Sequence, residues 1–430
     1  MKGNALKIIA AVTAVAAIAS ATAFFVTKDK GSSPLGVDTT EKPTVVYSYD
    51  SSAYTADQSL RALDAVYLPT DISGVYYTAD LSGNIAFFEY SGGAMVPSAL
   101  EVKEVSTKLY ASFENIPVTV KYIEKDGKVC GYGVFTASMN ADVDVYSYAF
   151  AKLINAPAGY GNGHLLLVDF EKENFSKPEK IYSEIYNFNL ASGKASTGVS
   201  MNTRLVGLDG ALRNDWTMFT DDFAANLGDA KYFLSSRYYT AEDRGRRADV
   251  MVFSSAYRPQ IVVEDILGLW FVNDANGMHF LRRTDGGFSS IVSLNGEEKV
   301  AATFEGDYFE NYIQDGKYII NKESLVLTDL MSGETKTLKD VNIKSADSMT
   351  VSPDGSKIVF AGMGEENSKG TLVQTLIYCT VDGSKEPAIF SEPLLFSESG
   401  GFVWLDASSV MSVRALSADG AKAGSVIYSY

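Results

Sequence analysis

The sequence contains few of the residues on which many enzyme sites depend. Histidine occurs twice, at His164 and His279, and cysteine twice, at Cys130 and Cys379. Two cysteines so far apart exclude a zinc knuckle and a CxxC redox pair. Both lie in strand-like runs, so we expect two buried thiols, with a single disulfide as the alternative. No G-x-S-x-G motif accompanies the histidines, which argues against a Ser-His-Asp hydrolase. We therefore expect no catalytic residue and no cofactor.

Basic residues are also in deficit. The chain of 430 residues has 37 Lys and Arg against 53 Asp and Glu, a net charge of −16. An acidic surface repels phosphate backbones, which argues against nucleic-acid partners. Hydrophobic residues make up 46% and aromatic residues 12%, a composition that favours a β-rich fold with a large core.

The first thirty residues predict a membrane-targeting segment. Lys2 and Lys7 precede an uncharged run over residues 8–26, and about 20 residues of helix cross a bilayer. Either a cleaved signal peptide or an uncleaved signal anchor fits. Cleavage would leave Phe24 at or near the new N-terminus and the run is long for a signal peptide, so we favour the anchor.

The domain boundaries follow from that segment. We predict a signal anchor or signal peptide over residues 1–30, a flexible polar linker over residues 31–43, and one domain over residues 44–430. The lysines before the span favour a cytoplasmic N-terminus, which places the domain outside the cytoplasm at the cell membrane, or secreted if the signal is cleaved.

Short strands ended by glycine turns dominate the rest of the chain, and no long amphipathic helix is evident. Gly accepts positive φ and Asp bonds its own backbone, so Asp-Gly pairs predict tight turns between strands. Three such pairs precede strand-like runs: Asp126 and Gly127, Asp315 and Gly316, Asp354 and Gly355. The last two pairs are about 40 residues apart, the length of a four-stranded propeller blade.

One stretch carries a family resemblance. The run SPDGSKIVFAG, a variable loop, LIYCTVDGS and EPAIF resembles the repeat of TolB-like propellers, also called WD40-like. The matching positions are Asp354, Gly355, Ile358, Phe360, Ile377, Tyr378 and Gly383. The match is good over residues 307–390, fair over residues 75–88, and poor over residues 142–270. The resemblance implies a β-propeller and no chemistry, because the matched residues build turns and cores.

We therefore predict an all-β protein, a β-propeller of about seven four-stranded blades, with six or eight as alternatives. The chain stops on a strand, Ser425 to Tyr430, whose edge needs a partner. We expect Thr44 to Tyr49 to supply it, so that strands from the two ends of the chain close the ring.

Five residues are candidate ligand contacts. Arg244, Arg246 and Arg247 lie at the tip of an expected hairpin and would receive an acidic glycan, a teichoic-type polymer or a partner's carboxylate. The alternative is a solvated loop neutralised by neighbouring acidic residues. Tyr160 and Tyr257 lie in expected loops and offer flat contact area, with ordinary packing as the alternative.

Acidic pairs at Asp142 with Asp144 and at Asp221 with Asp222 lack the spacing of an EF-hand, so we expect solvated carboxylates and no metal site. The sequence favours a non-enzymatic extracytoplasmic propeller that binds an envelope protein or polysaccharide. The alternative is a glycan-binding or glycan-active propeller, since two channel carboxylates suffice for glycoside hydrolysis.

Overall fold

A computed structural model describes most of the chain from Ser59 onward. The described residues are 59–63, 65–80, 83–111, 114–135, 146–155, 163–172, 182–200, 205–206, 212–213, 232–238, 246–253, 259–271, 278–294, 297–306, 311–314, 318–330, 332–338, 346–362, 365–366, 372–385, 387–393, 402–415 and 423–430. The membrane segment and linker predicted for residues 1–43 lie outside them. Within the described ranges, no helix is long and apolar enough to cross a membrane.

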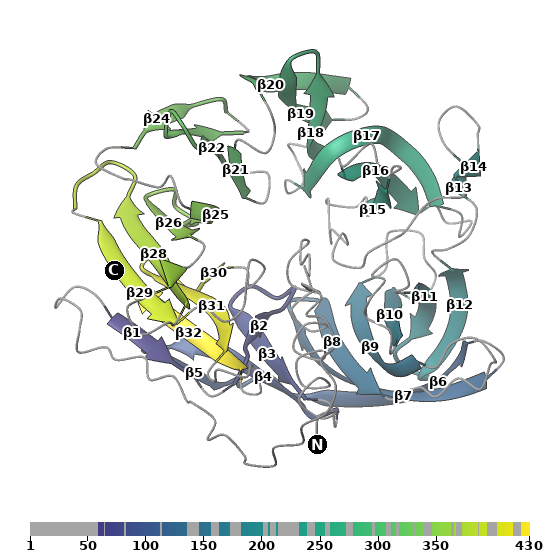
Figure 1. The fold of residues 1–430 in the computed structure, drawn as a ribbon. Coiled ribbons are helices and arrows are strands. Elements are labelled where there is room, and N and C mark those ends of the chain that lie inside the picture. The colour runs from purple at the N-terminus through teal and green to yellow at the C-terminus, as the bar shows by residue number, and fades with distance from the viewer. Residues whose placement is uncertain are drawn as a thin grey trace, which may run out of the picture.

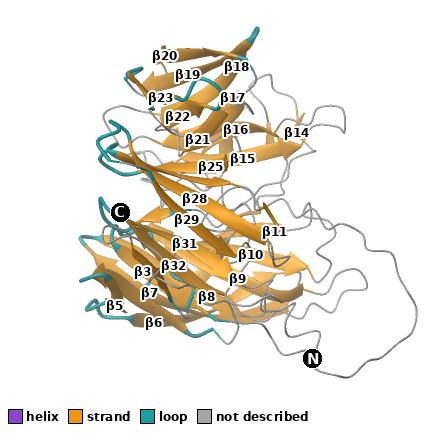
Figure 2. Ribbon diagram, turned by 60° about the vertical axis from the view of Figure 1, so that its left-hand side comes forward, coloured by secondary structure: helices purple, strands orange, loops and turns teal. Residues whose placement is uncertain are grey.

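Every regular element in the described residues is a β-strand, and Figure 2 shows only strands and loops there. Runs rich in Tyr, Phe and Val, such as VYYTA over Val75–Ala79, favour strands because β-branched and aromatic side chains pack well on a pleated surface. The predicted all-β class is confirmed.

Six sheets of four or more strands are described, and Figure 1 shows them arranged around a common centre. Within each sheet the strand pairs are antiparallel, mostly between neighbours in the chain. This is an arrangement of the β-propeller type, in which each sheet packs against the next.

Three of these sheets have four strands, as predicted. They are β2 (Leu68–Pro69), β3 (Val75–Ala79), β4 (Ile85–Ser91) and β5 (Ala94–Pro97); β21 (Asn311–Gln314), β22 (Tyr318–Asn321), β23 (Val326–Asp329) and β24 (Thr335–Thr337); and β1 (Ser59–Ala62), β32 (Ala423–Ser429), β31 (Ser409–Ala415) and β30 (Val403–Trp404).

The other sheets are wider, which corrects the prediction of four strands throughout. One has five strands: β25 (Ala346–Val351), β26 (Lys357–Gly362), β27 (Glu365–Glu366), β28 (Leu372–Thr380) and β29 (Ala388–Pro393). One has six: β15 (Tyr232–Tyr238), β16 (Arg246–Phe253), β17 (Pro259–Phe271), β18 (Met278–Thr284), β19 (Gly287–Leu294) and β20 (Glu297–Glu305). One has seven: β6 (Lys103–Ala111), β7 (Glu114–Lys125), β8 (Lys128–Phe135), β9 (Tyr146–Asn155), β10 (His164–Lys172), β11 (Tyr182–Asn189) and β12 (Lys194–Ser200). A separate pair joins β13 (Leu205–Val206) and β14 (Leu212–Arg213).

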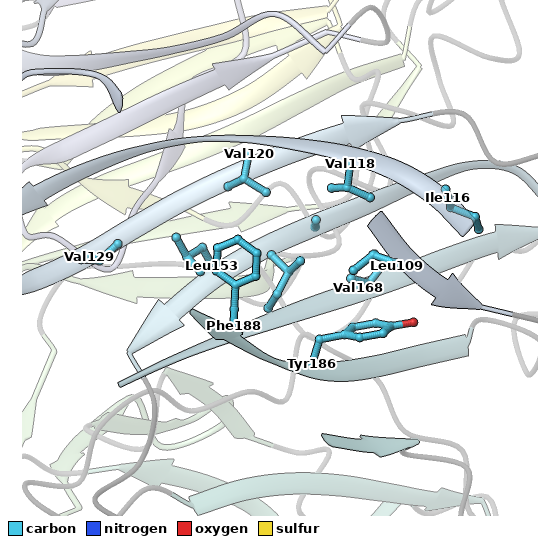
Figure 3. Close-up of a cluster of buried hydrophobic side chains, with 11 residues drawn as sticks. Leu109, Ile116, Val118, Val120, Val129, Leu153, Val168, Tyr186 and Phe188 are labelled. Atoms are coloured by element: carbon cyan, nitrogen blue, oxygen red, sulfur yellow. The ribbon is translucent and has the colours of Figure 1, made fainter. Parts of the chain in front are cut away.

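The seven-stranded sheet curls over its own core. Eleven buried residues from β6 to β11 form one cluster, and Figure 3 shows Val118, Leu153 and Phe188 among them. Gly193, in the turn before β12, lies so close to β6 that a Cβ there would be 3.0 Å from the carbonyl oxygen of Ser106. Hydrogen bonding runs on from β8 into β9 and from β9 into β10, so the sheet does not divide after four strands counted from either edge.

Strands from opposite ends of the described chain pair with each other. β1 is antiparallel to β32, with Leu60 opposite Tyr428. We predicted that Thr44 to Tyr49 would take this place. That segment lies outside the described residues, and the prediction is wrong about the partner, because β1 and β31 occupy the two edges of β32.

Apolar clusters fill the spaces between neighbouring sheets. One joins β2–β4 to β7–β9, and others join β18–β19 to β22–β23, β22–β23 to β25–β28, and β26–β29 to the sheet that contains β1. A fifth joins Tyr76 of β3 to Met411 of β31 and Ile427 of β32. The first and last sheets in the chain therefore pack against each other.

Candidate functional site

The predicted arginine hairpin is present, but two of its arginines lie within a strand. β15 and β16 pair in the register that places Tyr238 opposite Arg246 and Arg237 opposite Arg247. Arg244 lies outside the described residues, as do Tyr160 and Tyr257. The sequence interpretation missed Arg237, which the hairpin register brings to the same end of the sheet.

The structural turns at Asp126, Gly127, Asp354 and Gly355 join adjacent strands. Asp126 and Gly127 have φ angles of 52° and 75° and form the two-residue turn between β7 and β8. The turn from β25 to β26 contains Asp354 and Gly355. Asp315 and Gly316 lie outside the described residues, between β21 and β22.

Asp354 organises its own turn. Its Oδ1 accepts hydrogen bonds from the Ser352 hydroxyl at 2.6 Å, the Ser356 hydroxyl at 2.8 Å and the Ser356 backbone N–H at 3.1 Å. These bonds, that from Ser352 first, lower the pKa of Asp354 to about 2. The carboxylate is thus used to hold a turn in shape.

Lys357, which follows that turn, ties two sheets together. Its ammonium group donates to the Ser408 hydroxyl at 2.8 Å and to the backbone oxygen of Tyr430 at 2.7 Å. Burial, and then the nearby charge of Lys385, lower the pKa of Lys357. The Tyr378 hydroxyl donates to the backbone oxygen of Ser408 at 2.9 Å, so this polar cluster stabilises the contact between β26, β28 and the last sheet.

Both cysteines are buried free thiols, as the first of our two interpretations predicted. Burial, and then the nearby carboxylate of Asp71, raise the pKa of Cys130. Burial raises the pKa of Cys379 to about 12. A thiol with a raised pKa stays protonated at neutral pH and is a poor nucleophile.

His279 belongs to a buried polar chain between two sheets. Its Nε2 is 2.5 Å from the Ser290 Oγ, and that hydroxyl donates to the backbone oxygen of Leu330 at 2.9 Å. A hydroxyl carries one hydrogen, so when Ser290 donates to Leu330 it accepts from His279, and the Nε2 of His279 carries a proton. This histidine joins β18 and β19 to the end of β23.

The acidic pairs Asp142 with Asp144 and Asp221 with Asp222 lie outside the described residues. Among the residues that are described, no three side chains of His, Cys, Asp or Glu come together to hold a metal ion.

No family model matches the chain, and no curated protein sequence matches it. Solved structures with some similarity include the WD40 domain of SCAP from fission yeast, at a TM-score of 0.35 and 10% identity, covering 89% of this chain and 97% of that one. A 6-phosphogluconolactonase-like protein from Bacteroides fragilis has a TM-score of 0.31 and 12% identity, covering 74% and 89%. AztD from Citrobacter koseri has a TM-score of 0.28 and 12% identity, covering 86% and 99%. Similarity at this level establishes no shared function, so a function for this chain has to come from its own residues.

Proposed function

We propose that the protein is a membrane-tethered β-propeller outside the cytoplasm that binds an envelope protein or polymer without acting on it chemically. A ring of sheets that pack face to face holds its loops on a rigid body, and such loops are the usual place for recognition. The tether is the apolar run of residues 8–26, joined to the ring by the linker of residues 31–43.

The packing of the first sheet against the last is the observation that carries this proposal. Tyr76, Met411 and Ile427 form one buried cluster across that boundary. The Tyr90 hydroxyl is 3.3 Å from the Ser409 Oγ, and Arg61 Nη1 donates to the backbone oxygen of Gly93 at 2.8 Å. These contacts support a ring that closes on itself.

We assign about seven blades to the ring, in the repeat pattern of TolB-like propellers. The five sheets of four to six strands each supply one blade. The seven-stranded sheet supplies two, because its halves face each other across a shared apolar core as two neighbouring blades do. The two halves remain joined by hydrogen bonds between β8 and β9.

Capture of a ligand by the full chain tests the proposed binding. The protein, purified in detergent with its N-terminal segment, is incubated with envelope extracts, and the bound proteins and glycans are identified. We expect one enriched envelope component that a chain unfolded in advance does not retain. Recovery of no such component contradicts the proposal, and release of sugar products favours a glycan-active propeller instead.

A second measurement tests the tether. We expect the full chain to stay with membranes after alkaline extraction and to be cleaved by protease added to intact spheroplasts. Deletion of residues 8–26 should leave the chain inside the cell. Protection of the full chain from external protease would place the domain on the cytoplasmic side of the membrane and contradict the proposal.

A further inference from the structure

β20 leaves one edge of the six-stranded sheet open. It is the last strand in the order of that sheet, and no described strand pairs with its other edge. Figure 1 shows it on the outside of the ring, away from the centre. Residues Glu297 to Val300 are all exposed, and Val300 is 54% exposed. The N–H and C=O groups along an open strand edge are a template on which another strand can pair.

Several other edge strands are shorter or end in proline. β24 has three residues, and β1 and β5 have four. Pro97 ends β5 and Pro393 ends β29, and proline has no N–H to donate to an added strand. β6 has nine residues, as β20 does, but Thr107 and Leu109 within it are buried. Among the edge strands whose side chains are described, β20 has the longest unbroken run of exposed residues.

The register shows which backbone groups of β20 point out of the sheet. Hydrogen-bonded and non-hydrogen-bonded pairs alternate along antiparallel strands. Phe288 and Phe304 are a hydrogen-bonded pair, because the carbonyl oxygen of Phe304 lies against the start of β19. Every second residue of β19 repeats this arrangement, so Val292 and Lys299 are another such pair. The N–H of Val300 is on the opposite side of the same trans peptide bond from the Lys299 carbonyl group, and it therefore points outward.

A β-bulge confines the open edge to the first half of β20. The register shifts beside Ile291, which leaves Ala301 as an extra residue on β20. A Cβ at Gly333, in the turn between β23 and β24, would be 3.1 Å from the carbonyl oxygen of Ala301. The neighbouring sheet therefore contacts β20 at the bulge. A bulge and charged residues protect an edge against pairing with a second copy along its whole length, so the open run suits a short segment of a different protein.

Charge at this edge favours a basic partner. Glu297 and Glu334, which lies in the turn between β23 and β24, are exposed and have no ion-pair partner among the described residues. Glu298 is already neutralised, because its carboxylate accepts two hydrogen bonds from Arg282 at 2.6 and 3.0 Å. Lys299 adds one positive charge. The net charge of −16 on the whole chain attracts a basic segment and repels an acidic one.

We propose that the edge of β20 from Glu297 to Val300 receives an extended basic segment of a partner protein as an added strand. Backbone hydrogen bonds provide the affinity, and the carboxylates select basic side chains on the segment. The inference rests on the proposed binding function and identifies its ligand as a protein. A polysaccharide lacks backbone N–H and C=O groups at the spacing of a strand, so it cannot extend the sheet.

Binding of three defined peptides by the full chain in detergent tests the proposal. The first is an eight-residue peptide of alternating Lys and Val with blocked ends. The second has the same side chains but carries N-methyl groups on two consecutive central residues, so each of its edges loses an N–H. The third has Glu in place of Lys. We expect the first peptide to bind, and the other two to bind at least tenfold more weakly, from lost backbone hydrogen bonds and from charge repulsion respectively.

Variants of the chain locate the site. Val300→Pro removes the outward N–H and should weaken binding of the Lys-Val peptide at least tenfold. Val300→Ala is the matched control, because it keeps the N–H and changes only the exposed side chain, and it should weaken binding less than about threefold. Glu297→Gln with Glu334→Gln should weaken binding roughly threefold to tenfold and leave the effect of N-methylation unchanged. Should Val300→Pro fail to fold, the N-methylated peptide makes the same test on the native chain.

Equal binding of the two Lys-Val peptides overturns the inference, because charge alone then explains the binding. Equal losses in Val300→Pro and Val300→Ala also overturn it, as does stronger binding of the Glu-Val peptide. A chain that captures an envelope component but binds no basic peptide overturns this inference alone. A chain that does neither overturns the proposed function as well.

Discussion

The sheets of four or five strands, called narrow below, and those of six or seven strands, called wide, differ in how they use glycine. In β21–β24 and β25–β29, Gly333, Gly355 and Gly383 lie in turns with φ between 67° and 73°. In the wide sheets, Gly131 lies inside β8, where a Cβ would be 2.5 Å from the Cβ of Tyr122. Gly287 is the first residue of β19, where a Cβ would be 1.9 Å from the carbonyl oxygen of Phe304. Glycine also turns the chain in the wide sheets, as at Gly127 between β7 and β8. At Gly131 and Gly287 it has a second use, because the missing side chain lets neighbouring strands approach closely.

This difference explains where the repeat resemblance ends. The repeat pattern is defined by its turns, and the described turns in this region, at Gly333, Gly355 and Gly383, join strands of the four- and five-stranded sheets. Residues 142–270 supply β9 to β17, which belong mostly to the seven- and six-stranded sheets. A sheet of six or seven strands does not end after its fourth strand. Its sequence is therefore not expected to show the turn spacing of a four-stranded repeat.

The comparison is tested most strongly by Gly287→Ala. The added methyl group meets backbone rather than a movable side chain, so we expect a loss of about 3 kcal/mol or more in the free energy of unfolding. Denaturant unfolding of the two chains measures it. Gly92→Ala is the control, because a Cβ at Gly92 meets no atom within 4 Å at a φ of 57°, and it should cost about 1 kcal/mol. Equal losses of unfolding free energy in the two variants would mean that a glycine at a close strand contact matters no more than a glycine in an open turn.

Ser290→Ala tests the boundary between a wide and a narrow sheet. The substitution removes the acceptor of His279 and the donor to the Leu330 backbone oxygen in a fully buried place. We expect the free energy of unfolding to fall by about 2 to 3 kcal/mol. Ser106→Ala is the matched control, since its bond to Thr119 is exposed, and it should cost less than about 0.5 kcal/mol. A loss as small as the control's would mean that the polar chain does not hold the two sheets together.

Ser425→Ala probes the sheet shared by the two ends of the chain. Its hydroxyl accepts from the Tyr67 backbone N–H at 2.9 Å, and Ser425 is fully buried. The loss should be about 1 to 2 kcal/mol. Hydrogen exchange should also speed up at Tyr67 more than at Tyr318, which lies in a different narrow sheet, β21–β24. Uniform acceleration would indicate general destabilisation rather than a local contact.

How much the sequence predicted depends on whether a feature is local. The turn at Asp354 is a property of five consecutive residues, and the strand after it follows from the continuous apolar run Ile358 to Phe360, which is buried throughout. The partner of β32 is set by packing across the whole chain. By propensity Thr44 to Tyr49 (TVVYSY) is a stronger strand former than Ser59 to Ala62 (SLRA), so propensity alone chose the wrong segment. Arg237 was missed for the same reason, because only the register of β15 with β16 places it beside Arg247.

The smallest expected effect is the pH dependence of the stability that the Asp354 carboxylate contributes. The pKa of Asp354 is about 2 in the folded chain, below the ordinary aspartate value of 3.8. A lowered pKa in the folded state stabilises the fold above the unfolded value, and that contribution disappears as the pH falls through the folded value. The difference in unfolding free energy between the native chain and Asp354→Asn should therefore shrink from pH 5 to pH 2. Because the carboxylate is exposed, the change should be only a few tenths of a kcal/mol. Asp126→Asn, the same substitution in the turn between β7 and β8 of the seven-stranded sheet, is the control. A difference that grows toward pH 2 contradicts the assignment.

A single cross-link tests the closed ring most directly. Ser59 and Ser429 are cross-strand partners, and the Cα separation of such partners lies within the range that a disulfide spans. Oxidation of Ser59→Cys with Ser429→Cys should join β1 to β32 in nearly every molecule, visible as a mobility shift without reductant, while the buried Cys130 and Cys379 stay reduced. If both introduced thiols instead react with maleimide and no cross-link forms, the two ends of the chain do not share a sheet and the ring is not closed.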